Sequence, residues 1–163
     1  MAATGIGEIP AAGEVAVGDP KPEASGRVIK LGLIGCGGRG SWLGELFVKH
    51  GGYEISAVAD YFPDRAEAAG DKFGVAKERR FSGLSACERL LASGVEAVTV
   101  VNVPHFHPDH GRAAIEAGCH VFAAKPVAVD VPGALKVQAS GRLATEKNLC
   151  YLVDYQMGTD PGR

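Results

Sequence analysis

Short apolar runs alternate with segments of helical periodicity from residue 28 to residue 154, and this alternation constrains the fold more than any other feature. The intervening segments repeat apolar side chains three and four positions apart, which is the spacing of one helix face. Strands and helices in strict alternation indicate βαβ units with right-handed crossovers. The sequence therefore predicts one α/β domain with an open, doubly wound parallel sheet, the Rossmann fold.

The expected strands cover residues 28–35, 54–60, 96–102, 120–123 and 149–154. The expected helices cover residues 41–50, 63–73, 84–93, 108–117 and 131–147. Ser85 and Glu88 fit the capping box, in which two side chains satisfy backbone amides at a helix start. Asp130 is the expected N-cap of the last helix, with Pro132 in its first turn.

Residues 1–27 differ in composition from the rest of the chain. Alanine, glycine and proline dominate them, and they contain no aromatic residue. Such a segment buries too little apolar surface to offset the entropy of ordering it. We expect a disordered N-terminal tail at 1–27 and a nucleotide-binding domain at 28–163.

Composition excludes several classes of protein. The net charge of −2 gives no sign of the basic face that nucleic-acid or anionic membrane surfaces require. No apolar stretch approaches the roughly 18 residues of a membrane span, and no secretory signal follows Met1. The four cysteines, with no C-x-x-C pair, are expected to be buried, reduced thiols, and they are Cys36, Cys87, Cys119 and Cys150. We expect a cytoplasmic protein, with export by a leader outside this sequence as the alternative.

The sequence Gly35-Cys36-Gly37-Gly38-Arg39-Gly40 has the form G-x-G-x-x-G between the first strand and the first helix. Gly35 permits the tight turn, Gly37 lets the backbone approach a pyrophosphate, and Gly40 lets the helix pack on the strand. The amides of the helix start favour a phosphate group. A glycine-rich turn without a ligand is the alternative interpretation.

Asp60 follows Gly40 by twenty residues and ends the second expected strand. An acid there accepts hydrogen bonds from the adenosine ribose hydroxyls and repels a 2′-phosphate, so NAD is favoured over NADP. Arg65 is close enough in sequence to weaken that preference slightly. Its alternative interpretation, which we favour here, is a solvated arginine on the second helix.

The second half of the chain resembles the Gfo/Idh/MocA oxidoreductases, through residues 96–126 and the sequence LVDYQ at 152–156. Together with the glycine turn, the resemblance covers residues 28–161. It implies an N-terminal NAD(P)-binding half of a sugar or cyclitol dehydrogenase. The substrate would be a small, sugar-like molecule.

The resemblance also implies site residues. The family has a Glu-Lys-Pro tripeptide whose lysine lies beside the nicotinamide ribose and the substrate hydroxyl; Lys125 and Pro126 match it, whereas Ala124 replaces the glutamate. Lys125 would assist proton transfer. In the loop after the third expected strand, Asn102 and Pro104 would line the cofactor. Val103 stands where the family often has threonine, so only the backbone of this loop is placed near NAD.

The resemblance further implies a second α/β domain, which this chain has no room to hold, so we expect the chain alone to be catalytically incomplete. An exposed docking surface would promote self-association. Two alternatives follow. The chain belongs to an NAD-dependent glycosidase of the same family, or it is a non-catalytic NAD-binding module.

The sequence His105-Phe106-His107-Pro108-Asp109-His110 supports a third alternative, a zinc-dependent hydrolase. The spacing H-x-H-x-D-H after an apolar strand is that of a metallo-β-lactamase-like metal site. A zinc site of that type needs further ligands well downstream, and only His120 follows His110. The hydrolase hypothesis also leaves the glycine turn unexplained. We therefore predict no metal and a partly exposed loop, with His107 the best candidate for a catalytic histidine.

Overall fold

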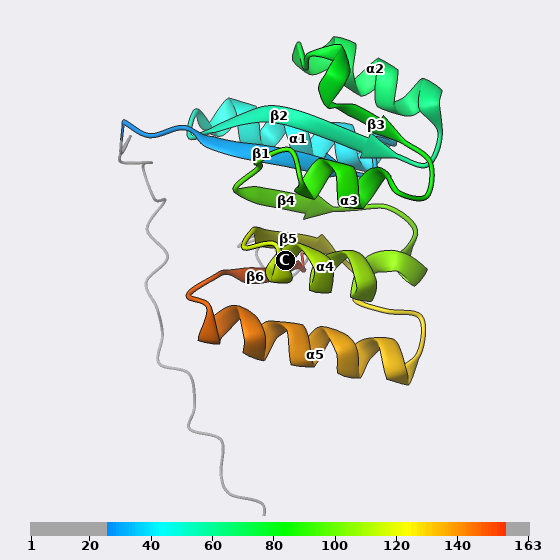
Figure 1. The fold of residues 1–163 in the computed structure, drawn as a ribbon, viewed down its shortest axis with the longest axis vertical. Coiled ribbons are helices and arrows are strands. Elements are labelled where there is room, and N and C mark those ends of the chain that lie inside the picture. The colour runs from blue at the N-terminus through cyan, green and yellow to red at the C-terminus, as the bar shows by residue number, and fades with distance from the viewer. Residues whose placement is uncertain (1–25, 156–163) are drawn as a thin grey trace, which may run out of the picture.

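Six parallel strands form one sheet in the computed structural model, which describes residues 26–155 (Figure 1). The strands are β1 (Ile29–Ile34), β2 (Tyr53–Asp60), β3 (Arg80–Ser82), β4 (Ala97–Val100), β5 (His120–Ala124) and β6 (Tyr151–Asp154). They lie in the order β3-β2-β1-β4-β5-β6. This order, with a reversal between β1 and β4, is that of a doubly wound dinucleotide-binding sheet.

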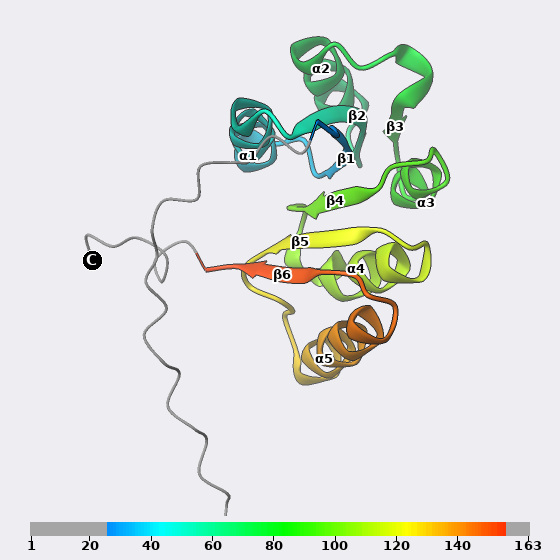
Figure 2. The same ribbon diagram turned by 90° about the vertical axis from the view of Figure 1, so that its left-hand side faces the viewer.

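Helices cover both faces of the sheet. They are α1 (Gly38–His50), α2 (Pro63–Phe73), α3 (Ala86–Leu91), α4 (His107–Glu116) and α5 (Val131–Glu146), with short 3-10 helices at Lys77–Arg79 and Pro104–Phe106. Figure 2 shows α1 and α2 on one side of the sheet and α3, α4 and α5 on the other. The predicted fold class is confirmed.

Two apolar clusters hold these layers together. One joins α3, α4 and α5 to the central strands, with Leu90, Val98 and Ile115 inaccessible to solvent. The other packs Leu31 and Leu33 beneath α1 and α2. On the α1 side, an apolar groove of about 210 Å³ runs over β4, β5 and β6, and it includes Phe122. No helix among residues 26–155 is long and apolar enough to cross a membrane.

Most element boundaries lie within a few residues of the prediction. Three other expectations need correction. Strand β3 was missed, because its sequence Arg-Phe-Ser has no apolar run and it pairs only with β2. The capping box does not form: Ser85 has ψ near 10° rather than an extended backbone, and its hydroxyl caps no amide. Asp130 does cap α5, accepting a hydrogen bond from the Gly133 amide at 2.7 Å.

The third correction concerns Cys150, which is exposed, whereas the other three cysteines are buried as predicted. Residues 1–25 of the predicted tail lie outside the described residues. Arg27, at its end, forms an ion pair with Glu96 just before β4.

Candidate functional site

The carboxyl ends of the parallel strands bring the predicted site residues to one edge of the sheet. The glycine turn follows β1, Asp60 ends β2, Asn102 follows β4, and Lys125 follows β5. Strands β1 and β4 are neighbours, but their connections leave in opposite directions, which opens a crevice at this edge. The edge is therefore the candidate ligand site.

Two glycines of the turn are required by the protein itself. Gly35 has a φ of 98°, and a Cβ there would lie 2.6 Å from the Asn102 amide nitrogen. A Cβ on Gly40 would lie 1.8 Å from the Gly35 carbonyl oxygen. Both neighbours are backbone atoms that cannot rotate away, so these glycines permit close packing of α1 against β1 and of β1 against the loop after β4.

The other two glycines of the turn leave open space. A Cβ on Gly38 would meet nothing within 4 Å, and one on Gly37 would meet only the Arg65 Nη1 at 3.8 Å. Gly37 is the N-cap of α1, and no side chain caps the helix start. An uncapped helix start carries partial positive charge on its amides, which suits an anionic group. The surface above Gly37 and Gly38 is thus open and chemically suited to a phosphate.

Asp60 lies beside this surface. Its Oδ2 accepts a hydrogen bond from the Cys36 amide at 2.7 Å, and its Oδ1 accepts one from the Phe62 amide at 3.0 Å. These bonds fix the carboxylate at the end of β2. Each oxygen retains further acceptor capacity, so the half-buried Asp60 can still accept hydrogen bonds from ligand hydroxyls.

Cys36 turns its side chain away from the crevice. Its thiol donates a hydrogen bond to the Ala59 carbonyl at 3.4 Å. Burial, reinforced by the charge of Asp60, raises the pKa of the Cys36 thiol to about 12. The side chain is therefore a neutral thiol packed in the core, and only the backbone of Cys36 faces the turn.

Arg65 lies closer to the turn than the sequence indicated. Its guanidinium stacks on the Phe62 ring at 4.9 Å from the ring centre, and its Nη1 lies beside Gly37. The arginine is exposed, as predicted, but it borders the site. Its stacking partner is the N-cap residue of the same helix, whereas the approach to Gly37 joins two elements and is not visible in the sequence.

Arg39, in the first turn of α1, forms an ion pair with Asp154 at the end of β6. Its guanidinium also lies over the Trp42 ring. Asp154 is 9% exposed and was not among the predicted site residues. The signal that could have found it is an acid directly after an apolar strand, as at Asp60.

The loop after β4 contacts the turn through Asn102. Its backbone packs against Gly35, and its Nδ2 lies 2.9 Å from the His110 Nδ1. Pro104 begins the short 3-10 helix that leads into α4. Between this loop and the end of β2 is a shallow cavity of about 40 Å³, whose lining includes Asp60, Tyr61 and Leu84.

His107 is buried, with 1% of its surface exposed, which corrects the expectation that it lies in a partly exposed loop. Its Nε2 lies 2.9 Å from the Asn102 carbonyl oxygen, and its Nδ1 lies 2.9 Å from the Pro126 carbonyl oxygen. The ring therefore joins the loop after β4 to the turn after β5. These partners are distant in sequence, which is why the burial was not foreseen.

The remaining residues of the histidine motif face different partners. Asp109 forms an ion pair with Lys136 at 2.5 Å, and the exposed His105 packs edge-on against Phe106. The His110 ring stacks on the Phe106 ring, and burial lowers the pKa of His110. Among residues 26–155, no three histidine, cysteine or acidic side chains are arranged to hold a metal ion. The zinc hydrolase hypothesis has no geometric support.

Lys125 is exposed immediately after β5, and the Lys125–Pro126 peptide bond is cis. Ala124, which precedes it, is buried and pairs in register with Asp154 on β6. The Pro126 carbonyl is held by His107. The lysine thus extends from a fixed turn on the same edge as the glycine turn.

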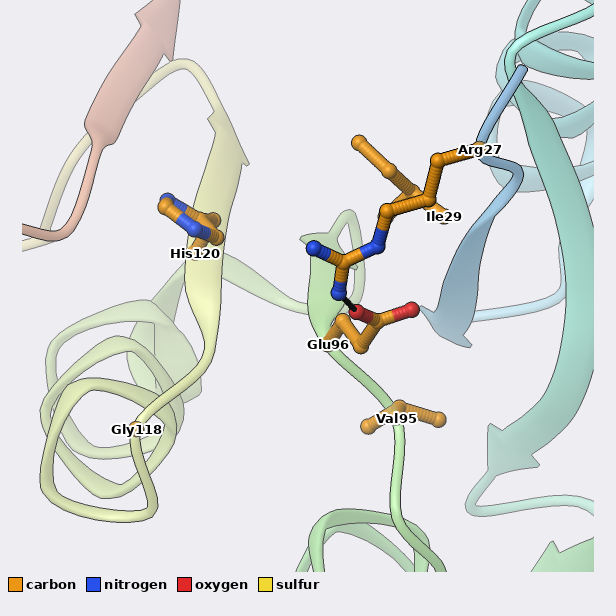
Figure 3. Close-up of a pocket in the computed structure, with 6 residues that line it drawn as sticks. All are labelled: Arg27, Ile29, Val95, Glu96, Gly118 and His120. Carbon is orange, nitrogen blue, oxygen red and sulfur yellow. Dashed lines mark hydrogen bonds and ion pairs between the residues drawn. The ribbon is translucent and has the colours of Figure 1, made fainter. Parts of the chain in front are cut away.

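A cavity of about 340 Å³ lies at the opposite edge of the sheet (Figure 3). Arg27 and Glu96 form an ion pair within it, and His120 lies on its far side. These residues lie at the amino ends of β1, β4 and β5. In a parallel sheet of this kind, ligands bind at the carboxyl ends, so this cavity is separate from the candidate site.

Comparison with known proteins agrees with this geometry. Residues 29–155 match the model of an oxidoreductase family with an NAD-binding Rossmann fold. A glycosyl hydrolase family 109 protein of Streptomyces coelicolor is 30% identical over 115 residues, which cover 68% of this chain and 24% of the relative. A myo-inositol dehydrogenase of Streptomyces leeuwenhoekii is 29% identical over 132 residues, covering 81% of this chain and 38% of the relative.

A solved structure is also similar. It is a variant of a 3-ketoreductase from Actinomadura kijaniata in complex with TDP-benzene and NADP, 27% identical, with a TM-score of 0.68. The alignment covers 83% of this chain and 41% of that one. The chain thus spans about two fifths, or less, of the proteins that it matches.

Proposed function

The chain belongs to the Gfo/Idh/MocA family of oxidoreductases and forms an NAD-binding Rossmann domain, and we propose that its carboxyl edge holds NAD beside a sugar-like or polyol substrate. The observation that carries the proposal is the open surface over Gly37 and Gly38, at an uncapped helix start and beside Asp60. The protein itself does not require glycine at 37, whereas close approach of a pyrophosphate does.

In this arrangement each part of the cofactor has a partner. The start of α1 would hold the pyrophosphate, and Asp60 would accept hydrogen bonds from the adenosine ribose. Tyr61 and Leu84, which border the shallow cavity next to Asp60, would hold the adenine. Lys125, beyond β4 and on the other side of the crevice, would then face the nicotinamide end.

Bound NAD would supply the hydride acceptor for oxidation of a carbinol carbon. Lys125 would hold the substrate hydroxyl at its Nζ and take part in moving the hydroxyl proton. His107 does not reach solvent, so its part is to hold the Pro126 carbonyl and thereby the turn that carries Lys125. His107 is therefore a positioning residue in this scheme.

The relative from Streptomyces coelicolor favours a second candidate, an NAD-dependent glycosidase. Such an enzyme oxidises the sugar only transiently and returns the hydride, so it retains its NAD. A non-catalytic NAD-binding module is the alternative without turnover. NAD released by denaturing the purified protein, in about one equivalent per chain, would support the glycosidase; protein purified without NAD would support exchange of cofactor, as in a dehydrogenase.

Calorimetric titration of the chain with NAD and with NADP tests the proposal. We expect saturable NAD binding, and about a tenfold loss in Asp60→Ala, because hydrogen bonds to a charged group contribute about 1.5–3 kcal/mol. The same variant should lose its preference for NAD over NADP. A chain that retains its native melting temperature and binds neither nucleotide would contradict the proposed site.

A further inference from the structure

The ion pair of Arg39 and Asp154 crosses the half of the crevice that lies away from Asp60. Arg39 belongs to the first turn of α1, directly after β1, and Asp154 ends β6. In the sheet, β4 and β5 lie between β1 and β6. The two side chains must therefore meet over the carboxyl ends of β4 and β5.

The strand register places Asp154 on the α1 side of the sheet. Phe122 pairs with Leu152, and Ala124 pairs with Asp154, so alternate residues on the two strands share a face. The Phe122 ring lies 5.5 Å from the ring of Phe47 on α1, which identifies that face. Ala124, which directly precedes Lys125, and Asp154 consequently project toward α1.

This register sets an acid beside Ala124. Asp154 lies on the neighbouring strand, at the position paired with Ala124 and on the same face of the sheet. Asp154 is nearly buried, and a buried carboxylate needs a cationic partner, which Arg39 supplies. The pair thus connects the glycine turn to the strand ends that carry Lys125.

We propose that Asp154, acting through Arg39, is a positioning residue for the nicotinamide end of the cofactor. The inference rests on the proposed function, which places the adenosine at β2 and the nicotinamide over β4 and β5. The pair holds the α1 side of that half of the crevice in a fixed geometry. Without Asp154, the guanidinium loses one of the contacts that hold it, so the nicotinamide ring meets a less ordered side chain.

ADP-ribose separates the two halves of the site, because it contains every part of NAD except the nicotinamide. We expect wild-type protein to bind NAD more tightly than ADP-ribose. Asp154→Asn should weaken the affinity for NAD by about tenfold, the effect of one charge-assisted hydrogen bond. The same variant should change the affinity for ADP-ribose by no more than about twofold, the ordinary limit for sites that act independently.

Two further variants serve as an independent test of the ion pair and as a control. Arg39→Met removes the other partner and should reproduce the loss of preference for NAD, even if Asp154→Asn does not fold. Asp71→Asn is the matched control, because it removes a carboxylate partner of Arg80, whose side chain is 7% exposed, at the far edge of the sheet. We expect it to lower the melting temperature without changing the affinity for either nucleotide.

The outcomes are distinct. Wild-type protein that binds neither nucleotide would overturn the proposed function itself. Equal affinity of the wild-type protein for NAD and ADP-ribose would overturn the positioning role and leave the NAD site standing. So would variants whose affinities for the two ligands fall in parallel. We expect Asp154→Asn and Arg39→Met to lose affinity for NAD alone, and Asp71→Asn to lose affinity for neither ligand.

Discussion

The fold depends on the absence of a side chain at Gly40, and Gly40→Ala measures that dependence. A Cβ at this position would lie 1.8 Å from the Gly35 carbonyl oxygen and 2.9 Å from its carbon. Real Cβ contacts are not found below 3.0 Å. Neither atom belongs to a side chain that can rotate, so the start of α1 must move away from β1.

The size of that displacement sets the expected loss in the free energy of unfolding. A shift of more than about 1 Å at a buried helix–strand contact corresponds to the upper end of overpacking costs, about 3 kcal/mol. For a domain of this size, such a loss lowers the melting temperature by about 10 °C. The effect arises in the folded protein without ligand and does not require NAD.

Thermal unfolding followed by circular dichroism measures this shift, with Gly141→Ala as the matched control. Gly141 lies inside α5, and a Cβ there meets nothing within 4 Å. Alanine in such a helix interior should raise stability by about 0.5–1 kcal/mol. Equal melting temperatures for Gly40→Ala and wild type would refute the close packing of α1 on Gly35.

Three further predictions concern acid sensitivity, thiol access and cofactor preference. Burial lowers the pKa of His110 below 6.5, so the fold disfavours its protonated form and loses stability as the pH falls through and below that value. His110→Gln should flatten the fall in melting temperature between about pH 7 and about pH 5, and an unchanged slope would contradict this. In native protein, Ellman's reagent should modify Cys150 rapidly and the three buried cysteines only on unfolding; two or more rapid thiols would count against the described core. Arg65→Ala should weaken NADP more than NAD, because the arginine borders the turn beside Asp60; parallel losses measured by calorimetry would show that it does not discriminate between them.

The sequence predicted the fold where the local pattern and the tertiary structure agree. Helix α2 has the predicted bounds because Pro63 opens it and Gly74 closes it with a left-handed backbone. Strand β3 was not predictable from pattern, because its pairing with β2, rather than its composition, makes it a strand. Helix α1 begins at Gly38 rather than Ser41, because the glycine turn is itself the first turn of the helix.

The site was predictable where one segment carries the chemistry. The glycine turn and Asp60 lie together because adjacent parallel strands end at the same edge. The contacts of His107 and Arg39 depend on partners from other elements, which a single sequence does not reveal. The same holds for the position of Arg65 beside Gly37, although its stacking partner Phe62 is local. Tertiary contacts changed the interpretation of these three side chains.

NAD titration of Gly37→Ala tests whether a pyrophosphate lies against Gly37. The protein accommodates a Cβ at this position, with the nearest atom at 3.8 Å and an ordinary φ of −67°. The variant should therefore keep the wild-type melting temperature. We expect it to bind NAD at least about a hundredfold more weakly than wild type, because the methyl group occupies the space of the phosphate. Equal NAD affinity in Gly37→Ala and wild type would show that no phosphate lies against Gly37.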